Sequence, residues 1–201
     1  MSRCVIISGG ELNKSDLKIL DDDFIICADS GYKHAKKYKI RVNLLIGDFD
    51  SLTDVLDDIE KITLNPIKDD TDTHSALKEG IKRGFKEFLF LGSLGKRMEH
   101  SFANISLLIQ VKNLGFAGKL IHKGKTYVVL RDEKITLKKK KKGYLSLFAL
   151  SEKCTGVSEK NLKYELDNYT LTNDYSIGID NEYINLSPTI EVKHGTILLI
   201  Y

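Results

Sequence analysis

The sequence predicts an α/β fold in which a domain built on a parallel sheet is followed by a small all-β domain. Three observations support it: apolar runs alternate with helical patterns up to His122, these patterns stop after Gly124, and acidic residues follow the apolar runs. Alternation is typical of βαβ units, whereas short β-branched and aromatic runs are typical of antiparallel sheets. We therefore expect an α/β domain over residues 1–123 and a β domain over residues 124–201.

The first domain contains apolar runs that are short enough for buried strands. They lie at residues 4–7, 24–27, 44–46, 62–64, 88–91 and 120–121. Two intervening helices are indicated, each with an apolar face and a glycine beyond its end. Their faces are Ala76, Leu77 and Ile81 before Gly84, and Phe102, Ile105 and Ile109 before Gly115. We expect both to be crossover helices of a Rossmann-like parallel sheet.

The second domain shows strand-like runs at residues 126–130, 135–137, 144–150 and 197–201, without a convincing helical pattern. This pattern favours a β-sandwich. A lysine run at residues 138–142, ended by Gly143, lies between two of these runs. We interpret it as a solvated hairpin tip rather than a phosphate or nucleic-acid site.

Composition excludes several classes of protein. The net charge of +3 in 201 residues is too small to indicate nucleic acid or an anionic membrane as partner. No apolar run approaches the roughly 18 residues of a membrane span, and no signal-peptide core is present. The three cysteines are scattered and form no Cys-x-x-Cys pair. Their odd number argues against a disulfide framework, so we expect a cytoplasmic protein.

Acidic residues gather where the predicted strands end, which is the ligand-binding edge of open parallel sheets. They are Asp29, Asp48, Asp50, Asp69, Asp70, Asp72 and, farther on, Glu99. Crowded carboxylates repel one another unless a cation lies among them, and Mg²⁺ binds carboxylate and phosphate oxygens. Taken singly, Asp48 and Asp50 are more often turn formers, and Thr71 or Asp72 is an ordinary N-cap. Their shared location favours a magnesium site and phosphate chemistry.

Glycine-rich and basic segments provide groups complementary to phosphate. They are Ser8-Gly9-Gly10, Gly92-Ser93-Leu94-Gly95, and Lys96 with Arg97. Glycines let the backbone approach phosphate closely, and arginine can bind it through two N–H groups. Neither a Walker motif nor Gly-x-Gly-x-x-Gly is present, so phosphate is held differently. His100 is either an acid–base group or a helix-end residue that satisfies backbone groups, and both interpretations stay open.

Four ordered motifs resemble the thiamine pyrophosphokinase family. They are Ala28-Asp29-Ser30-Gly31, Gly47-Asp48-Phe49-Asp50-Ser51, Thr71-Asp72, and Gly95-Lys96-Arg97-Met98-Glu99-His100 with Ala103-Asn104. The β-rich tail is similar to the C-terminal domain of the family, although this half matches less closely. It carries Gly178-Ile179-Asp180-Asn181-Glu182 and Gly195-Thr196-Ile197-Leu198.

The resemblance implies an ATP-dependent pyrophosphoryl transfer to thiamine, giving thiamine pyrophosphate and AMP. It also implies a homodimer whose thiamine sites lie between the α/β domain of one subunit and the β domain of the other. Asp48, Asp50 and Asp72 would hold Mg²⁺ and, with Arg97, form the catalytic set. The implied ATP contacts are Asp29, Ser51, Thr71, Arg97, Glu99, His100 and Asn104, and the implied thiamine contacts are Asp72, Asp180 and Asn181.

The sequence departs from the family pattern at three positions. The family usually has a glycine and an aspartate where this chain has Lys96 and Glu99, and a serine where it has Asp180. Glutamate keeps the charge, and lysine offers an additional group for phosphate. Because Asp180 is one of the departures, the resemblance supports a thiamine contact by Asn181 more than one by Asp180.

Two other functions remain open. A magnesium-dependent nucleotide pyrophosphohydrolase would use the same carboxylates with water as acceptor. A non-catalytic sensor of thiamine or nucleotide would need no metal-activated transfer apparatus, so the presence of Asp48, Asp50, Asp72 and Arg97 argues against it.

Overall fold

The structure, a computed structural model, describes residues 3–49, 58–65 and 69–201. It forms two compact units, Met1–Gly124 and Lys125–Tyr201. The units divide at Gly124, next to the predicted boundary. Asp50 and Ser51, both predicted site residues, lie outside the described residues.

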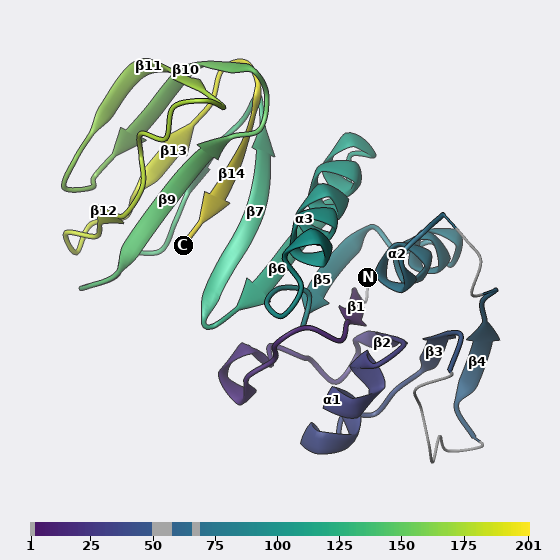
Figure 1. Ribbon diagram of the computed structural model, residues 1–201. Helices are drawn as coiled ribbons and strands as arrows, with labels where there is room; N and C mark the ends of the chain where they lie inside the picture. Colours follow the sequence, from purple (N-terminus) through teal and green to yellow (C-terminus); the bar gives the residue numbers. More distant parts are fainter. Residues whose placement is uncertain (1–2, 50–57, 66–68) are drawn as a thin grey trace. The chain divides into compact units, whose positions relative to one another are not determined.

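The first unit is built on a parallel sheet, as predicted. Over its described residues the strand order is β6-β5-β1-β2-β3-β4 (Figure 1). The strands are β1 (Cys4–Ile7), β2 (Phe24–Ala28), β3 (Leu44–Gly47), β4 (Glu60–Thr63), β5 (Glu87–Leu91) and β6 (Ala117–His122). The central strands are apolar along their length because helices cover both faces.

Strand β4 corrects one prediction. The run at residues 62–64 suggests a buried strand, yet three of the four residues of β4 are exposed and Ile62 is only half-buried. In the described sheet β4 is an edge strand that pairs with β3. An edge position leaves its side chains in contact with water, which a short apolar run cannot reveal.

Helices lie on both faces of the sheet (Figure 1). They are α1 (Gly31–Tyr38), α2 (Asp72–Lys82) and α3 (Met98–Asn113), with a short 3-10 turn, η1 (Lys14–Asp16). Helix α1 packs Tyr32 and Ala35 into the same core as Val5 and Ile7. Helices α2 and α3 contact each other and cover the opposite face, where Gly80 lies against Phe88. None of the described helices is long and apolar enough to cross a membrane.

The buried face of α3 differs from the predicted one. Phe102 is 66% exposed, and Ile105 and Ile109 are only half-buried. The face toward the sheet instead carries Leu107, Leu108 and Val111, with Ser101 and Asn104 nearer the start of the helix. The predicted face was wrong because α3 has apolar residues on more than one side. Periodicity alone cannot choose between such sides.

The second unit is the predicted sandwich, formed over its described residues by two antiparallel sheets (Figure 1). One has the order β12-β9-β14-β7 and the other the order β11-β10-β13-β8. The strands are β7 (Lys125–Arg131), β8 (Lys134–Thr136), β9 (Tyr144–Ala149), β10 (Lys153–Lys160), β11 (Leu166–Thr172), β12 (Asn181–Glu182), β13 (Thr189–Glu191) and β14 (Thr196–Ile200). Inward residues such as Leu147, Leu199, Val157 and Ile190 form the core between the sheets.

The lysine run at residues 138–142 is not a hairpin tip. It joins β8 of one sheet to β9 of the other, so it connects the two layers of the sandwich. Lys140 lies over the rings of Tyr183 and Tyr201, at 5.0 and 5.4 Å from their centroids. Desolvation in this place lowers the pKa of Lys140. All residues of the run are exposed, so the interpretation as a solvated segment is confirmed, and Lys140 additionally contacts two aromatic rings.

Candidate active site

The candidate site lies where the strand order reverses. Strands β2, β3 and β4 follow one another on one side of β1, whereas β5 and β6 lie on the other side of β1. The loops that follow β1 and β5 therefore diverge, which opens a crevice at the carboxyl edge of the sheet. A pocket of about 510 Å³ occupies this place. The predicted residues that line it are Asp29, Asp48, Thr71, Asp72, Arg97, His100 and Asn104.

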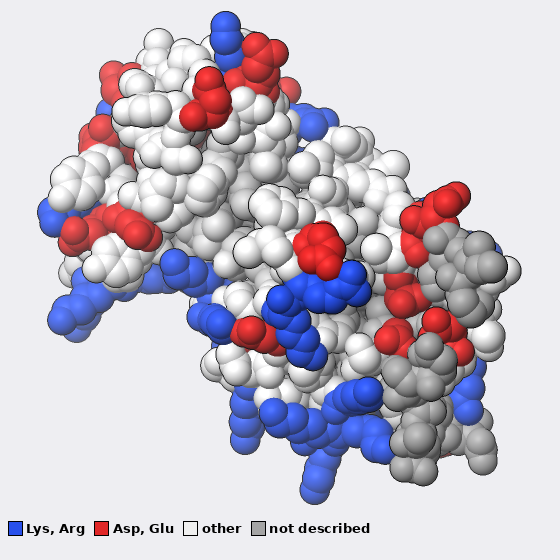
Figure 2. All heavy atoms as spheres, in the orientation of Figure 1, with Lys and Arg blue, Asp and Glu red and all other residues white. Residues whose placement is uncertain are grey.

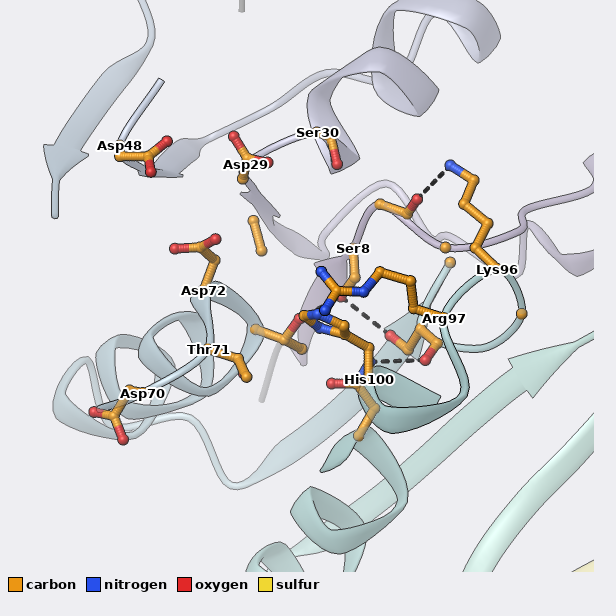
Figure 3. A pocket seen from close by; sticks show the side chains of 18 residues that line it. Ser8, Asp29, Ser30, Asp48, Asp70, Thr71, Asp72, Lys96, Arg97 and His100 are labelled. Carbon is orange, nitrogen blue, oxygen red and sulfur yellow. Dashed lines mark hydrogen bonds between the residues drawn. The ribbon is translucent and has the colours of Figure 1, made fainter. Parts of the chain in front are cut away.

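Two glycines allow neighbouring elements to approach closely at the edge of the pocket. A Cβ on Gly31 would lie 2.0 Å from the carbonyl oxygen of Ile7, and a Cβ on Gly47 would lie 3.1 Å from Cα of Asp29. A side chain on Gly31 would push the start of α1 away from the end of β1, and one on Gly47 would push the end of β3 away from Asp29. The glycines of the two motifs thus place the carboxylates of Asp29 and Asp48 on the same side of the pocket (Figure 3).

The carboxylates of Asp29, Asp48 and Asp72 lie around a common space (Figure 3). The Oδ1 atom of Asp29 is buried and has no hydrogen-bond partner within the described residues. Asp72 begins α2, whose N-cap Thr71 accepts a hydrogen bond from the N–H of His74 at 3.2 Å. A helix N-terminus stabilises negative charge, so Asp72 is well placed to act as an anionic ligand.

Asp70 also lines the pocket, but its carboxylate already has partners. It pairs with Nζ of Lys78 and, at 3.0 Å, with Nδ1 of His74. The hydrogen bond from Lys78 is the main reason that the pKa of Asp70 is lowered. In the predicted acidic run, Asp70 therefore contacts Lys78 and His74, and Asp72 lies on the side of the pocket that carries Asp29 and Asp48 (Figure 3).

Basic groups form the other side of the pocket, on the loop before α3 (Figure 3). The Nε atom of Arg97 donates to Oε1 of Glu99 at 2.6 Å, and Nζ of Lys96 donates to the carbonyl oxygen of Gly9 at 2.6 Å. The backbone N–H of Glu99, followed by Arg97, lowers the pKa of the Glu99 carboxyl. Glu99 is exposed and orients Arg97, while His100 in the first turn of α3 faces the pocket.

Acidic and basic side chains also gather in different places on the visible face. An acidic group lies at the right of the picture, and most basic side chains of this unit lie below and to the left of it (Figure 2). A ligand with both metal and phosphate groups suits such a division, since each group meets the opposite charge.

Buried hydroxyl groups also line the pocket, and of these the sequence analysis names the segments of Ser8 and Ser93 but not Thr73. Ser8 Oγ lies 3.0 Å from Thr73 Oγ1 and 3.2 Å from Ser93 Oγ. Nδ2 of Asn104 donates to the carbonyl oxygen of Ser93 at 2.7 Å, so this amide supports the loop after β5. Thr73 lies 65 positions and Ser93 lies 85 positions from Ser8 in the sequence. No local signal in the sequence could have linked them.

The loops after β1 and β5 are also joined through their backbones. Gly10 N–H donates to the carbonyl oxygen of Gly92 at 2.6 Å, and Glu11 N–H donates to that of Leu94 at 2.8 Å. Nε2 of His34, on α1, donates to the carbonyl oxygen of Gly10 at 2.8 Å. His34 therefore positions the loop that contains Gly9 and Gly10. Its isolated place in the sequence does not suggest this role.

The predicted thiamine contacts of the second unit differ in exposure. Asp180 is exposed, and its N–H donates to Oγ of Ser146 at 3.0 Å. Asn181 is buried: its Nδ2 donates to the carbonyl oxygen of Tyr164 at 2.6 Å and to Oε2 of Glu159 at 3.2 Å. Its Oδ1 accepts the N–H of Tyr164 at 3.0 Å. The Asn181 side chain therefore orders the turn between β10 and β11, and its contact with thiamine stays a prediction.

The carboxylates of the pocket can be compared with what a metal ion requires, and the binding of Mg²⁺ stays a prediction. Among the described residues, no group of three or more His, Cys, Asp or Glu side chains is arranged to hold an ion. Mg²⁺ usually binds through one or two carboxylates, with waters and substrate phosphates completing its octahedron. The unpaired, buried oxygen of Asp29 beside Asp48 and Asp72 is the kind of donor set that this requires. Asp50, the remaining predicted ligand, is outside the described residues.

Comparison with solved structures shows the same fold in known enzymes. The chain matches the crystal structure of thiamine pyrophosphokinase from Bacillus subtilis with a TM-score of 0.90 and 23% identity, covering 99% of this chain and 98% of that one. A thiamin pyrophosphokinase family protein from Enterococcus faecalis matches with a TM-score of 0.83 and 25% identity, covering 99% and 98%. Thiamin pyrophosphokinase from Candida albicans matches with a TM-score of 0.80 at 14% identity, covering 99% and 88%.

Sequence comparison agrees with the fold. The thiamine pyrophosphokinase of Bacillus subtilis (strain 168) is 27% identical over 161 residues, which span 77% of this chain and 75% of the relative. The family model described as Thiamin pyrophosphokinase, catalytic domain, matches residues 17–117. A second, described as Thiamin pyrophosphokinase, vitamin B1 binding domain, matches residues 132–197. Together these matches extend over most of both structural units, and the chain therefore belongs to the thiamin pyrophosphokinase family of enzymes.

Proposed function

We propose that this enzyme transfers the terminal pyrophosphate of ATP to the hydroxyl of thiamine and releases AMP. The supporting observation is the pocket at the strand-order reversal, where carboxylates face Lys96, Arg97 and His100. Phosphoryl transfer depends mainly on positioning and on compensation of charge over the phosphate oxygens. The two sides of the pocket offer groups for both tasks.

In the proposed reaction, the oxygen of the thiamine hydroxyl forms a bond to the β-phosphorus of ATP. The bond from this phosphorus to the oxygen shared with the α-phosphate breaks, and AMP leaves with the bonding electrons. Arg97 compensates charge on the phosphate oxygens once it exchanges Glu99 for phosphate. Asp72 orients the entering hydroxyl or accepts its proton.

Asp48 and Asp72, with support from Asp29, would hold Mg²⁺, and Asp50 completes the proposed set. Bound Mg²⁺ supplies charge compensation to the phosphate chain. Asp29 contributes a buried oxygen that has no other partner in the described residues. Chelation of magnesium by excess EDTA is expected to abolish turnover. Addition of excess Mg²⁺ is then expected to restore turnover.

We also propose a homodimer in which the thiamine site joins the α/β unit of one subunit to the β unit of the other. The match of residues 132–197 to a vitamin B1 binding domain supports a role of the β unit in binding thiamine. Asp180 and Asn181 are the proposed contacts there. A cytoplasmic location is the expected setting, since Cys4, Cys27 and Cys154 are all free thiols.

The decisive experiment is to incubate purified protein with ATP, magnesium and thiamine and to separate the products. Equal amounts of AMP and thiamine pyrophosphate, both dependent on thiamine, are expected. AMP formed without thiamine would instead identify a nucleotide pyrophosphohydrolase. Folded protein that binds nucleotide but forms neither product would identify a sensor.

A further inference from the structure

Lys96 has an unusual place in the pocket. Its backbone is left-handed, with φ of +56°, and it follows Gly95 at +82°. A lysine in this conformation costs about 1 kcal/mol relative to glycine, because its Cβ crowds the neighbouring carbonyl. Glycine would form this turn more easily, so the chain places a long cationic side chain where none is needed to form the turn.

Neighbouring contacts fix the direction of this side chain. The Glu11 carboxylate pairs with Nζ of Lys123 at 2.8 Å, and this pairing, with a smaller contribution from the backbone of Lys96, lowers the pKa of Glu11. Glu11 also packs so closely on Gly95 that a Cβ there would lie 2.7 Å from its Cδ. Glu11 thus packs against the turn at Gly95. The Lys96 side chain extends across the edge of the pocket to the carbonyl oxygen of Gly9 (Figure 3).

The ammonium group of Lys96 keeps capacity for an anion. Its observed partner is the neutral carbonyl oxygen of Gly9, and none of the carboxylates described in the structure forms an ion pair with it. Arg97, by contrast, is paired with Glu99. An ammonium has three N–H donors, so at least two remain for phosphate oxygens. Replacing a neutral acceptor by a charged one strengthens the hydrogen bond.

We propose that Lys96 binds the phosphate chain of the nucleotide and so increases the selectivity of this enzyme for ATP over adenosine. The ammonium moves from the Gly9 carbonyl to a phosphate oxygen while the backbone of the turn stays in place. The proposal rests on the proposed function, since that function places the polyphosphate in this pocket.

The test compares binding of adenosine and of α,β-methylene ATP, which cannot be cleaved at the reacting bond, by calorimetry in magnesium buffer. Lys96→Gly should weaken the binding of α,β-methylene ATP about five- to tenfold, as expected for the loss of one partly screened charged hydrogen bond. The affinity for adenosine should not change. Lys96→Arg keeps the charge and should stay within about twofold of the unchanged protein.

Lys39→Gly is the matched control. Lys39 ends α1 with φ of +54°, nearly the same as Lys96, but does not line the pocket. Both changes relieve the same backbone conformation, so a general effect of glycine would appear in both variants. Binding of α,β-methylene ATP should fall only in Lys96→Gly.

Turnover separates this proposal from the proposed function. In an active enzyme, Lys96→Gly should raise the KM for ATP about five- to tenfold, with kcat and the KM for thiamine within about twofold. Equal losses for adenosine and α,β-methylene ATP, or no loss for either, would overturn the role of Lys96. Unchanged protein that forms no thiamine pyrophosphate would instead overturn the proposed function, whatever the binding results.

Discussion

The position of Asp72 in the pocket predicts a strong dependence of turnover on its charge. It lies at the N-terminus of α2, where negative charge is stabilised, and it faces Asp29 and Asp48. Asp72→Asn keeps the size of the side chain and removes the charge. We expect turnover to fall at least about 100-fold at saturating magnesium, because ligand and orienting roles are both lost.

Asp70→Asn is the control for this change, because Asp70 lines the same pocket but is paired with Lys78 and His74. Its turnover should remain within a few-fold of the unchanged enzyme, measured as thiamine pyrophosphate formed. Nearly full turnover in Asp72→Asn would remove both proposed roles of Asp72.

Glu99 acts through Arg97. Its carboxylate is exposed and accepts a hydrogen bond from Nε of Arg97. Glu99→Asp retains the charge and shortens the side chain by one methylene, so we expect activity within about threefold of the original. Far-ultraviolet circular dichroism should confirm the fold. Unfolding of this variant would indicate that Glu99 mainly stabilises the start of α3.

Glu159 predicts a pH dependence of stability. Burial raises its pKa to about 7, although the hydrogen bond from Asn181 acts in the opposite direction. Since the unfolded value is lower, at about 4.5, folding is favoured while Glu159 is protonated, and this contribution is lost as pH rises through 7. Ionised Glu159 should cost up to about 3 kcal/mol at pH 8.

Urea unfolding between pH 5 and pH 8, followed by tyrosine fluorescence, measures this effect. Glu159→Gln removes the ionisation and should flatten the dependence, so that the variant is more stable than the original at pH 8. Glu152→Gln, at an exposed position, should leave the dependence unchanged. A steep dependence that survives in Glu159→Gln would assign it to other groups.

At the scale of elements, the two sides of α3 make a direct comparison. Leu108 is 1% exposed and packs toward the sheet, whereas Phe102 is 66% exposed. Leu108→Ala should therefore lower the free energy of unfolding by about 2–5 kcal/mol. Phe102→Ala should change it by less than about 0.5 kcal/mol, because it creates no cavity. Comparable losses in both variants, measured by denaturant unfolding, would contradict the described packing.

The crossover elements also explain why the site lies where it does. Strands β1 and β5 are neighbours, yet their following loops lead to opposite directions along the sheet. Buried hydroxyls of Ser8, Thr73 and Ser93 fill the space between these loops and α2. The position of the pocket is thus a property of strand order, and the side chains determine what it binds.

At the scale of the whole molecule, the proposed thiamine site requires two chains. We expect sedimentation velocity to show a dimer at the concentrations used for the assay. A mixture of an Asp72→Asn chain and an Asp180→Ala chain should then recover part of the activity lost in each alone, because one site per mixed dimer keeps both residues. A monomer under all conditions, with full turnover, would exclude the shared site.

The sequence by itself determined the fold class, the family and most pocket residues. Apolar runs bounded by acids and glycines are local signals, and the ordered motifs around Asp29, Asp48, Asp72 and Arg97 carry the family pattern in the chain itself. Parallel strands with buried faces have a distinct composition, which is why the inner strands were predicted correctly.

Tertiary structure alone decided which faces are buried and which distant groups meet. The exposed side of α3, the edge position of β4 and the connection of residues 138–142 between two sheets depend on neighbours that local periodicity does not specify. The contacts of Lys96 with Gly9, and of Ser8 with Thr73 and Ser93, likewise join residues far apart in sequence. The physical reason is that burial and hydrogen bonding are set by the packing of elements, whereas a sequence pattern reports only on one element at a time.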